Sequence, residues 1–348
     1  MAEATNTSTE AAVRGGLVRL MFGTMAAQVV GSATRFGLPD ALGDGVRSAP
    51  DLAAENELSV QSMRRLLRAL AALDILVEES PDHFRLAPAG ALLRTDRPDS
   101  MHALVRVFTA PLMCRGWEHL DTSLRTGETS FDAVFGTDFF GYLKDKPELS
   151  ALFNAAMSQG TQGLAAAVSQ QFDFGSFTTV ADIGGGDGTL VSAVLRAYPH
   201  LSGIVFDTVE GSAQAVGTLE KAGVADRCRV VTGDFFAAVP EGADLYLLKS
   251  ILHDWDDDRA ATILGHCRRV VPETGRLLIV EPVLPETVEP KQQPVSYLSD
   301  LNMLVNVGGL ERTRSDFVRL CERAGFTLTA ISQAGPGAGL CLIEAAPA

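Results

Sequence analysis

The second half of the chain alternates regularly between short apolar runs and longer helical patterns. The first pair is TTVADIGGGDG and TLVSAVLRAYP, and the alternation continues as far as GRLLIVEPVL. Consecutive parallel strands need a crossover connection, which is usually a helix, so this pattern predicts a parallel sheet with helices on both faces. The chain ends with FTLTAISQAGPGAGLCLIEA, which favours an antiparallel hairpin at the edge of that sheet.

The first half of the chain has a mainly helical pattern. Apolar residues between positions 18 and 36 recur at three- and four-residue spacing and form one stripe. Ser48, followed by Pro50, and then Ser59 are typical helix starts, and LDILVEESPDHFRLAPAG predicts two short strands around a Ser-Pro-Asp turn. Helix, helix and hairpin in this order indicate a winged helix. We expect a helical and winged-helix domain at 1–100, a helical linker at 101–170 and the α/β domain at 171–348.

Composition restricts the class of function. The 348 residues include 43 acids and 29 bases, for a net charge of −14, which disfavours a nucleic-acid partner. Five scattered cysteines without a CxxC pair predict reduced thiols. The stretch MAEATNTSTEAAV does not have the pattern of a signal peptide, and no apolar run approaches the roughly 18 residues that span a bilayer. We expect a cytoplasmic protein with no membrane partner.

A glycine-rich loop, VADIGGGDG, marks the predicted end of a strand and start of a helix. Gly184, Gly186 and Gly188 allow a sharp turn and a close approach of a ligand to the backbone. Such a loop is also compatible with a plain βα turn or a dinucleotide site. Asp207 ends the next predicted strand, 19 residues after Gly188, where a carboxylate can accept hydrogen bonds from both ribose hydroxyls.

The acids around this loop indicate which nucleotide it binds. Asp234, in GDFF, can accept a hydrogen bond from an adenine amino group, and Phe235 can lie on the ring; Asp234 is equally compatible with capping its own loop. Asp182 and Asp187 would repel a pyrophosphate, but they suit a ligand with a sulfonium and an amino group. The set favours S-adenosylmethionine over NAD.

Six motifs follow one another in a specific order. They are VADIGGGDG, IVFDTVE, GDFF, LLKSILHDW, IVEPVLPE and GGLERT. Their order resembles the plant caffeate-type O-methyltransferases and their actinobacterial relatives in antibiotic and pigment biosynthesis, over nearly the whole chain. The resemblance implies a Rossmann-like methyltransferase domain with a mostly parallel seven-stranded sheet, an N-terminal winged-helix dimerisation domain, and a homodimer. DTVE and NVGG depart from the plant pattern, which favours the bacterial branch and puts the plant substrates in doubt.

The resemblance also assigns the site residues. Positions that match the cofactor contacts are Gly184, Asp207, Asp234, Phe235 and Lys249. Positions that match the catalytic base and its two flanking acids are His253, Glu281 and Glu311. Positions that match the acceptor pocket, in FNAAM and DLNML, are Phe153, Met157, Asn302 and Met303. Met and Phe at helical spacing are also typical of an ordinary core, whereas Asn302 needs a hydrogen-bond partner if it is buried. Apolar walls with few polar groups suit a flat aromatic or quinonoid hydroxyl compound.

Methyl transfer to a phenol explains why a histidine is needed. A phenol has a pKa of about 10, so a histidine with a pKa of about 6.5 can remove its proton as the oxygen attacks, which is worth on the order of 10²–10⁴-fold in rate. A carboxylate on the other ring nitrogen fixes the tautomer. Because strand ends converge at one edge of a parallel sheet, His253, Glu281 and Glu311 can meet there. The alternatives are an exposed histidine at a helix start and two solvated loop acids.

Other functions remain open on the sequence. Asp256, Asp257 and Asp258 suit a helix N-terminus and could instead hold Mg²⁺, but a histidine base makes a metal unnecessary, and we expect none. An N-methyltransferase, or a relative that binds S-adenosylmethionine without methyl transfer, is the first alternative. A winged-helix transcriptional regulator is the second. Its support consists of four basic residues, Arg14, Arg64, Arg65 and Arg68.

Overall fold

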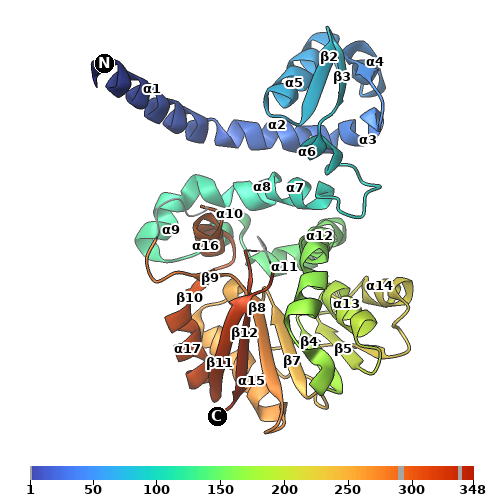
Figure 1. The fold of residues 1–348 in the computed structure, drawn as a ribbon, viewed down its shortest axis with the longest axis vertical. Helices are drawn as coiled ribbons and strands as arrows, with labels where there is room; N and C mark the ends of the chain where they lie inside the picture. The colour runs from blue at the N-terminus through green and yellow to red at the C-terminus, as the bar shows by residue number, and fades with distance from the viewer. Residues whose placement is uncertain (1, 289–293, 336–338) are drawn as a thin grey trace. The chain divides into compact units, whose positions relative to one another are not determined.

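The fold is that of a computed structural model, which describes residues 2–288, 294–335 and 339–348. The chain divides into two compact units, Met1–Pro111 and Leu112–Ala348 (Figure 1). The helices expected as a linker are divided between them, since α7 (His102–Phe108) belongs to the first unit and α12 (Pro147–Gln171) to the second. Among the described helices, none combines the length and the apolar character that a bilayer crossing requires.

The first unit contains the predicted winged helix. Its elements are α1 (Ala2–Met21), α2 (Gly23–Arg35), α3 (Leu38–Leu42), β1 (Arg47–Ser48), α4 (Ala49–Glu55), α5 (Val60–Ala72), β2 (Leu76–Ser80), β3 (His83–Leu86) and α6 (Pro88–Ala91). The side chain of Ser48 caps α4 and that of Ser59 caps α5, as predicted. The three strands pair antiparallel in the order β1-β3-β2. Leu67 of α5 and Phe84 of β3 are fully buried, so the hairpin and the helices share one core.

A seven-stranded sheet forms the centre of the second unit. Its strands are β4 (Thr179–Ile183), β5 (Ser202–Asp207), β6 (Cys228–Thr232), β7 (Leu245–Lys249), β8 (Arg276–Glu281), β11 (Phe326–Gln333) and β12 (Cys341–Pro347). They lie in the order β11-β12-β8-β7-β4-β5-β6, with five parallel strands and an antiparallel edge hairpin. This confirms the predicted sheet. Residues 336 and 337 of the predicted Gly-Pro-Gly turn lie outside the described residues.

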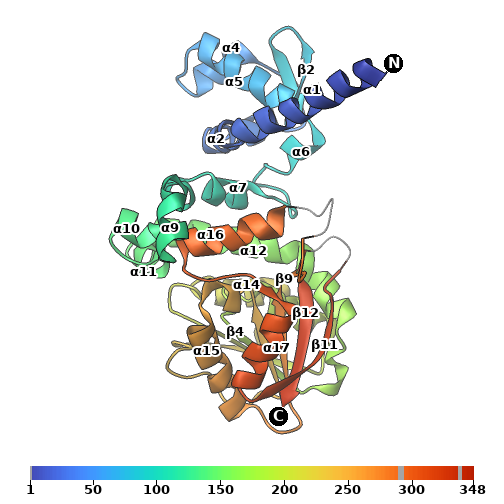
Figure 2. The same cartoon turned by 90° about the vertical axis from the view of Figure 1, so that its left-hand side faces the viewer.

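Helices cover both faces of this sheet, because side chains on successive strand residues point to opposite sides. On β4, Val180 packs with α12, α13 (Thr189–Ala197) and α14 (Ala215–Ala222). The next residue, Ala181, packs with α15 (Asp257–Val270) and α17 (Arg314–Arg323) on the other face. Figures 1 and 2 show these two helical layers on either side of the strands. The near-continuous apolar strands of the sequence follow from this double burial.

The remaining elements lie before and beside the sheet. They are α8 (Pro111–Cys114), η1 (Gly116–His119), α9 (Leu120–Thr126), α10 (Ser130–Phe135), α11 (Phe139–Lys144), η2 (Phe174–Ser176), η3 (Leu252–Asp254), β9 (Val283–Leu284), α16 (Val295–Asn306) and β10 (Arg312–Thr313). Helix α16 packs against α9, α10 and η1. Strand β9 follows β8 and pairs in parallel with β10, where Arg312 lies opposite Val283. This pairing brings the residues before β10 to the carboxyl end of β8.

Candidate functional site

The glycine loop connects β4 to α13, as predicted. Gly184, Gly186 and Gly188 have φ values of +70°, +55° and +77°, a region that side chains other than glycine rarely adopt. A Cβ atom at Gly184 would lie 2.3 Å from Cδ1 of Ile251. Ile251 belongs to the segment that carries His253. The absence of a side chain at Gly184 therefore lets the glycine loop and the histidine segment come into contact.

Asp207 is attached to the same loop. It ends β5, the neighbour of β4, and its Oδ2 accepts a hydrogen bond from the backbone N–H of Gly186 at 2.8 Å. Its Oδ1 accepts one from the N–H of Thr208 at 2.7 Å. Burial raises the pKa of the Asp207 carboxyl, and these hydrogen bonds oppose the shift. Asp207, the residue predicted to bind the ribose, thus lies at the carboxyl end of its strand, beside the glycines.

The two acids of the loop itself, Asp182 and Asp187, do not form the ligand-facing pair that we expected. Asp182 is 2% exposed and lies beneath the loop, and its Oδ2 has no hydrogen-bond partner among the described residues. Burial and the nearby charge of Asp207 raise its pKa to about 7, against the opposing effect of Lys249. Burial in turn lowers the pKa of Lys249, which ends β7. Asp187 accepts hydrogen bonds from Ser158 Oγ and Thr189 N.

Aromatic residues flank the loop. Asp234 lies two residues beyond β6 and is exposed, and its Oδ1 accepts a hydrogen bond from the N–H of Phe236, so it caps its own turn. The ring of Phe235 is half-buried beside Trp255, with 6.1 Å between ring centroids. A Cβ atom at Gly184 would lie 3.8 Å from this Phe235 ring. The motifs in the sequence did not indicate Trp255 as a site residue, although it lies two residues after His253.

His253 and Glu311 are in direct contact. His253 lies in η3, four residues beyond the end of β7, and its Nδ1 is 3.1 Å from Oε1 of Glu311. The same carboxylate oxygen accepts a hydrogen bond from Oγ of Ser299 on α16, at 2.7 Å. The Glu311 side chain is fully buried and that of His253 is 15% exposed. The predicted histidine–carboxylate pair is therefore present, and the alternatives of an exposed histidine and a solvated Glu311 are wrong.

Glu281 is buried at the same place but does not contact the imidazole ring. Its Oε1 accepts hydrogen bonds from three consecutive backbone N–H groups, those of Ile251 (3.0 Å), Leu252 (2.6 Å) and His253 (3.3 Å). Glu281 therefore contacts the histidine segment, as expected of an acid that flanks the base, but through the backbone of that segment. The sequence correctly predicted that Glu281 lies at the end of a strand near His253. It could not show whether the carboxylate contacts the imidazole ring or the backbone. Its 1% exposure also excludes the solvated loop position.

Buried carboxylates determine the charge of His253. Burial by itself lowers the pKa of the imidazole, but the charge of Asp254, the hydrogen bond to Glu311 and the charge of Glu281 outweigh it and raise the pKa to about 9. Oδ1 of Asp254 lies 3.7 Å from Nε2 of His253. Burial raises the pKa of Asp254 to about 6, while the nearby His253 opposes the shift. In the ligand-free protein the imidazolium form therefore predominates at neutral pH.

The four predicted acceptor residues lie on two helices. Phe153 and Met157 are on α12, and Phe153 packs on the ring of Phe139 with 5.3 Å between centroids. Asn302 and Met303 are on α16 and are 8% and 9% exposed. Asn302 lies one helical turn from Ser299, which donates a hydrogen bond to Glu311, the partner of His253. Asn302 is therefore on the part of α16 that lies near the histidine–carboxylate pair. The ring contact of Phe153 connects it to α11 instead.

Asn302 has the hydrogen-bond partners that its burial requires. Its Oδ1 accepts hydrogen bonds from Nε1 of Trp117 at 3.1 Å and from Nδ2 of Asn306 at 2.8 Å. The indole N–H can only donate, so this contact fixes which end of the Asn302 amide is the oxygen. The Nδ2 of Asn306 also donates to the carbonyl of Met113. The expectation of a partnered amide is confirmed, and Trp117 is a neighbour that the sequence did not indicate.

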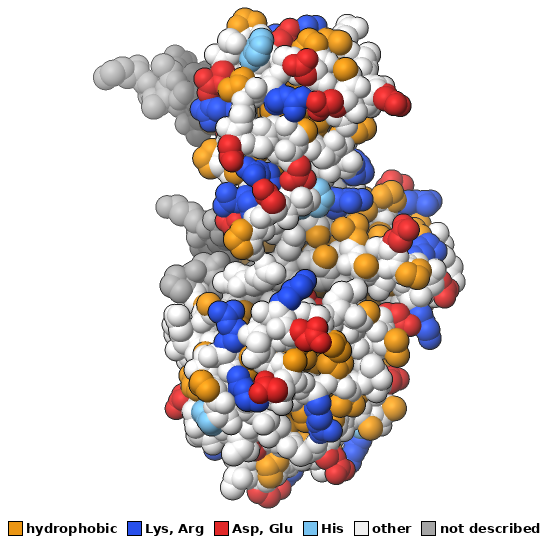
Figure 3. Space-filling model, turned by 90° about the vertical axis from the view of Figure 1, so that its right-hand side faces the viewer, with side chains coloured by type: hydrophobic (Ala, Val, Ile, Leu, Met, Phe, Trp, Pro, Cys, Tyr) orange, Lys and Arg blue, Asp and Glu red, His pale blue; other side chains and the backbone are white. Residues whose placement is uncertain are grey.

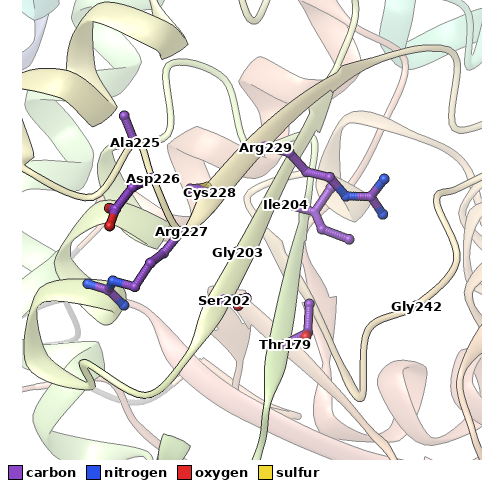
Figure 4. Close-up of a pocket in the computed structure, with 10 residues that line it drawn as sticks. All are labelled: Thr179, Ser202, Gly203, Ile204, Ala225, Asp226, Arg227, Cys228, Arg229 and Gly242. Atoms are coloured by element: carbon purple, nitrogen blue, oxygen red, sulfur yellow. The ribbon is translucent and has the colours of Figure 1, made fainter.

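A shallow pocket lies at the other end of the sheet. Its lining includes Thr179, Ser202 and Cys228, the first residues of β4, β5 and β6 (Figure 4). The guanidinium of Arg227, which also lines it, donates hydrogen bonds to the carbonyls of Leu195 and Leu201. Ligands of parallel sheets bind at the carboxyl ends of the strands, where the glycine loop and His253 lie. This pocket is therefore separate from the candidate site.

Several residues that suggested a metal site or a DNA-binding surface have hydrogen-bond or ion-pair partners within the protein. Asp256 caps α15 by accepting a hydrogen bond from the N–H of Arg259, and within the described ranges no group of three or more metal-ligating side chains is found. On α5, Arg64 forms a double hydrogen bond with Asp82 of the hairpin, at 2.6 Å for each contact. Nε of Arg68 lies 3.6 Å from Oε1 of Glu78, also on the hairpin. On the surface shown in Figure 3, basic side chains lie among acidic ones.

Comparisons with known proteins cover both units. Residues 117–327 match the O-methyltransferase domain, and residues 18–96 match the O-methyltransferase dimerisation domain. O-demethylpuromycin-O-methyltransferase of Streptomyces alboniger is 48% identical over 95% of this chain and 88% of its own length. The solved structure of LaPhzM has a TM-score of 0.91 at 39% identity, covering 97% of this chain and 99% of the other.

A further solved structure contains ligands. It is an O-methyltransferase (NcsB1) from neocarzinostatin biosynthesis in complex with S-adenosyl-L-homocysteine and 1,4-dihydroxy-2-naphthoic acid. It has a TM-score of 0.77 at 29% identity, covering 94% of this chain and 96% of the other.

Proposed function

Because this chain belongs to the O-methyltransferase family and is an S-adenosylmethionine-dependent methyltransferase, we propose that it methylates a hydroxyl group of an aromatic or quinonoid secondary metabolite, with His253 as general base. The contact between His253 and the buried Glu311, beside the glycine loop, is the observation that carries this proposal. A histidine placed at the carboxyl ends of the strands, with a carboxylate on Nδ1, has the arrangement of a general base.

The residues at the strand ends fit the methyl donor. S-adenosylmethionine, when bound, supplies an electrophilic methyl group on a positively charged sulfur. We assign its binding to Gly184, Asp207, Asp234, Phe235 and Lys249. At Gly186 an added Cβ would meet no atom within 4 Å, so the backbone there is open to a ligand. Asp207 supplies a carboxylate for the ribose, and Phe235 an aromatic face for the adenine.

His253 has the geometry to accept the proton of the acceptor. With Nδ1 bound to Glu311, the ring has Nε2 for the hydroxyl, and Glu311 stabilises the imidazolium that forms. Glu281 holds the backbone of the histidine segment through its N–H groups. Because the ligand-free pKa is about 9, His253 must lose its proton before it can act as a base. The remaining acceleration comes from holding both substrates in line.

The acceptor is proposed from the pocket residues and the relatives. Phe153, Met157 and Met303 provide apolar surface, and Asn302 provides a single oriented amide. The relatives named above act on O-demethylpuromycin or bind a dihydroxynaphthoic acid, and both compounds contain an aromatic ring. A flat hydroxylated ring suits such walls.

We also assign a homodimer to the first unit, which matches the dimerisation domain. Several apolar side chains of α1, α2 and the residue between them are exposed in the single chain, including Leu20 (78%), Met21 (73%) and Phe22 (54%). An exposed apolar surface of this kind typically marks an interaction site.

Calorimetric titration with S-adenosylhomocysteine, with NAD⁺ as control, tests the cofactor assignment. We expect binding of the former only, and its loss in Asp207→Ala. Incubation with S-adenosylmethionine and either O-demethylpuromycin or 1,4-dihydroxy-2-naphthoic acid then tests transfer. In His253→Ala, kcat/KM should fall by about 10²–10⁴-fold with unchanged S-adenosylhomocysteine binding. Wild-type kcat/KM in this variant would exclude His253 as the base, and methylation of an amine in place of the hydroxyl would indicate an N-methyltransferase.

A further inference from the structure

The segment that carries His253 leaves the sheet in an unfavourable backbone conformation. We refer to residues 250–255 as the His253 turn. Ser250, directly after β7, has a φ of +54°, a region that residues other than glycine seldom occupy. Such conformations persist only where the surrounding structure holds them. The position of the imidazole therefore depends on contacts made to the backbone of this turn.

Two buried charged side chains bind that backbone. Glu281 accepts hydrogen bonds from the N–H groups of residues 251–253. Arg312 binds carbonyl groups instead: its Nη1 donates to the carbonyl of Leu252 at 2.8 Å, and its Nη2 donates to the carbonyl of Trp255 at 2.9 Å. Its Nε donates to Oδ1 of Asp257 at 2.9 Å. The two carbonyls bound by Arg312 lie on either side of His253 in the sequence.

Arg312 is also buried and closely connected to the catalytic pair. It is 1% exposed, and it directly follows Glu311, which contacts the imidazole. At Gly309, three residues earlier, an added Cβ would lie 2.0 Å from the carbonyl oxygen of His253. The segment 309–312 therefore packs directly on the His253 turn. It supplies both the carboxylate that orients the ring and the guanidinium that holds the backbone.

We propose that Arg312 is a positioning residue for proton transfer, which holds the His253 turn so that Nε2 of His253 meets the acceptor hydroxyl. A guanidinium is needed because its planar fork donates to three separate oxygens at once, whereas an ammonium group is a compact point charge. A displacement of about 1 Å by a change away from the reacting atoms can reduce the rate about a hundredfold. This inference rests on the proposed role of His253.

The substitution Arg312→Lys tests it, because it keeps the charge and removes the fork. With O-demethylpuromycin as acceptor, we expect kcat to fall by about 10- to 100-fold. The dissociation constant of S-adenosylhomocysteine should change much less than kcat, because Glu281 still holds Ile251, the residue of the turn that lies against Gly184, whereas Arg312 binds the carbonyls of Leu252 and Trp255. Arg323→Lys is the matched control: Arg323, at the end of α17, forms an ion pair with Asp258 of α15, and its half-exposed side chain makes no hydrogen bond or ion pair with the His253 turn in the described structure, so kcat should stay unchanged.

A second readout does not depend on any acceptor. Amide hydrogen exchange at residues 251–255, measured in the S-adenosylhomocysteine complex, should be faster in Arg312→Lys than in the wild type and in Arg323→Lys. Wild-type exchange and wild-type kcat in folded Arg312→Lys would overturn the proposal. A lower Tm with unchanged kcat and exchange would also overturn it, because Arg312 would then be merely structural.

Two further variants keep the test decisive. If Arg312→Lys does not fold, Asp257→Ala removes one of the three acceptors at an exposed side chain, and unchanged kcat and exchange there would count against the proposal. If His253→Ala retains full activity, the proposed base has failed. A loss of activity in His253→Ala combined with full activity in Arg312→Lys would overturn the positioning role alone.

Discussion

At the scale of single residues, the protonation of His253 depends on carboxylates from three separate elements. Asp254 belongs to η3, Glu281 ends β8, and Glu311 precedes β10. Glu311 is the one that makes a hydrogen bond to the ring. Their combined effect raises the pKa of the imidazole to about 9, although burial opposes it. An individual carboxylate can therefore be tested by its effect on this pKa.

The substitution Glu311→Gln should lower the pKa of His253. It removes a negative charge and the charge-assisted hydrogen bond, both of which favour the imidazolium. NMR titration of the histidine ring protons in the ligand-free protein measures this pKa, with His253→Asn to assign the signals. We expect a value near 9 in the wild type. Glu286→Gln, which alters an exposed acid bound to Ser315, serves as control. An equal pKa in Glu311→Gln and wild type would contradict this account.

The raised pKa also has a consequence for the reaction rate. A base acts only in its unprotonated form, and a pKa of about 9 leaves a small fraction of His253 unprotonated at neutral pH. We therefore expect kcat/KM for S-adenosylmethionine to increase with pH from 7 to about 9. In Glu311→Gln the rise should occur at lower pH. Initial rates across this range measure it, and a pH-independent wild-type kcat/KM would argue against His253 as base.

At the scale of elements, the turn from β4 to α13 has two glycine positions that differ in their surroundings. Gly184 and Gly186 both have positive φ, but an added Cβ would meet Ile251 at the first and no atom within 4 Å at the second. Backbone strain acts at both positions, whereas a clash with the histidine segment acts at Gly184 alone. These two glycines form a matched pair for separating the two effects.

Alanine at these positions should have unequal effects. In Gly186→Ala we expect a loss of about 1–2 kcal/mol in the free energy of unfolding, from the left-handed backbone conformation. In Gly184→Ala the loss should be larger, and S-adenosylhomocysteine should bind at least about tenfold more weakly, because Ile251 must move. Denaturant unfolding and calorimetric titration measure both. Equal losses in the free energy of unfolding in the two variants would show that contact with Ile251 is unimportant, whereas binding can weaken in both because the Cβ at Gly186 would enter space that is open to the ligand.

At the scale of the whole molecule, the first unit exposes an apolar surface that its own core does not use. Of the predicted stripe at 18–36, Ala33 is buried in the core, but Val18, Phe22 and Met25 are 49%, 54% and 60% exposed. The periodicity correctly indicated apolar positions on one face. Only part of that face packs within the single chain, which is consistent with a second copy covering the remainder.

A charge on this surface should prevent dimer formation. Light scattering of the wild type should give the mass of a dimer, and the double variant Phe22→Asp/Met25→Asp should give that of a monomer, because association would bury unpaired carboxylates. Val216→Asp provides the control, since Val216 is an equally exposed apolar residue on α14 of the other unit. A monomeric wild type, or a dimeric double variant, would refute the assignment.

Features that depend on near neighbours in the sequence were predictable. Ser48 and Ser59 cap the helices that they precede, and Asp207 and Glu281 end the strands that alternation predicted. In each case the determining interaction is local: a cap bonds to a backbone N–H two or three residues away, and a strand ends where its apolar run ends. The order of the six motifs, which is that of the O-methyltransferase family, then indicated that the residues at the strand ends bind S-adenosylmethionine.

Tertiary structure alone decided which groups these residues contact. Glu281 binds backbone N–H groups and not the imidazole, Asp182 lies beneath the loop, and Arg312 reaches two carbonyls 57 and 60 residues away in sequence. Such contacts depend on the distances between loops that strands β8, β9 and β10 place side by side. The periodicity of side chains along the sequence contains no information about those distances. The sequence therefore determined the fold and the family and indicated the residue that we propose as the base, whereas the packing of segment 309–312 on the His253 turn was decided only in three dimensions.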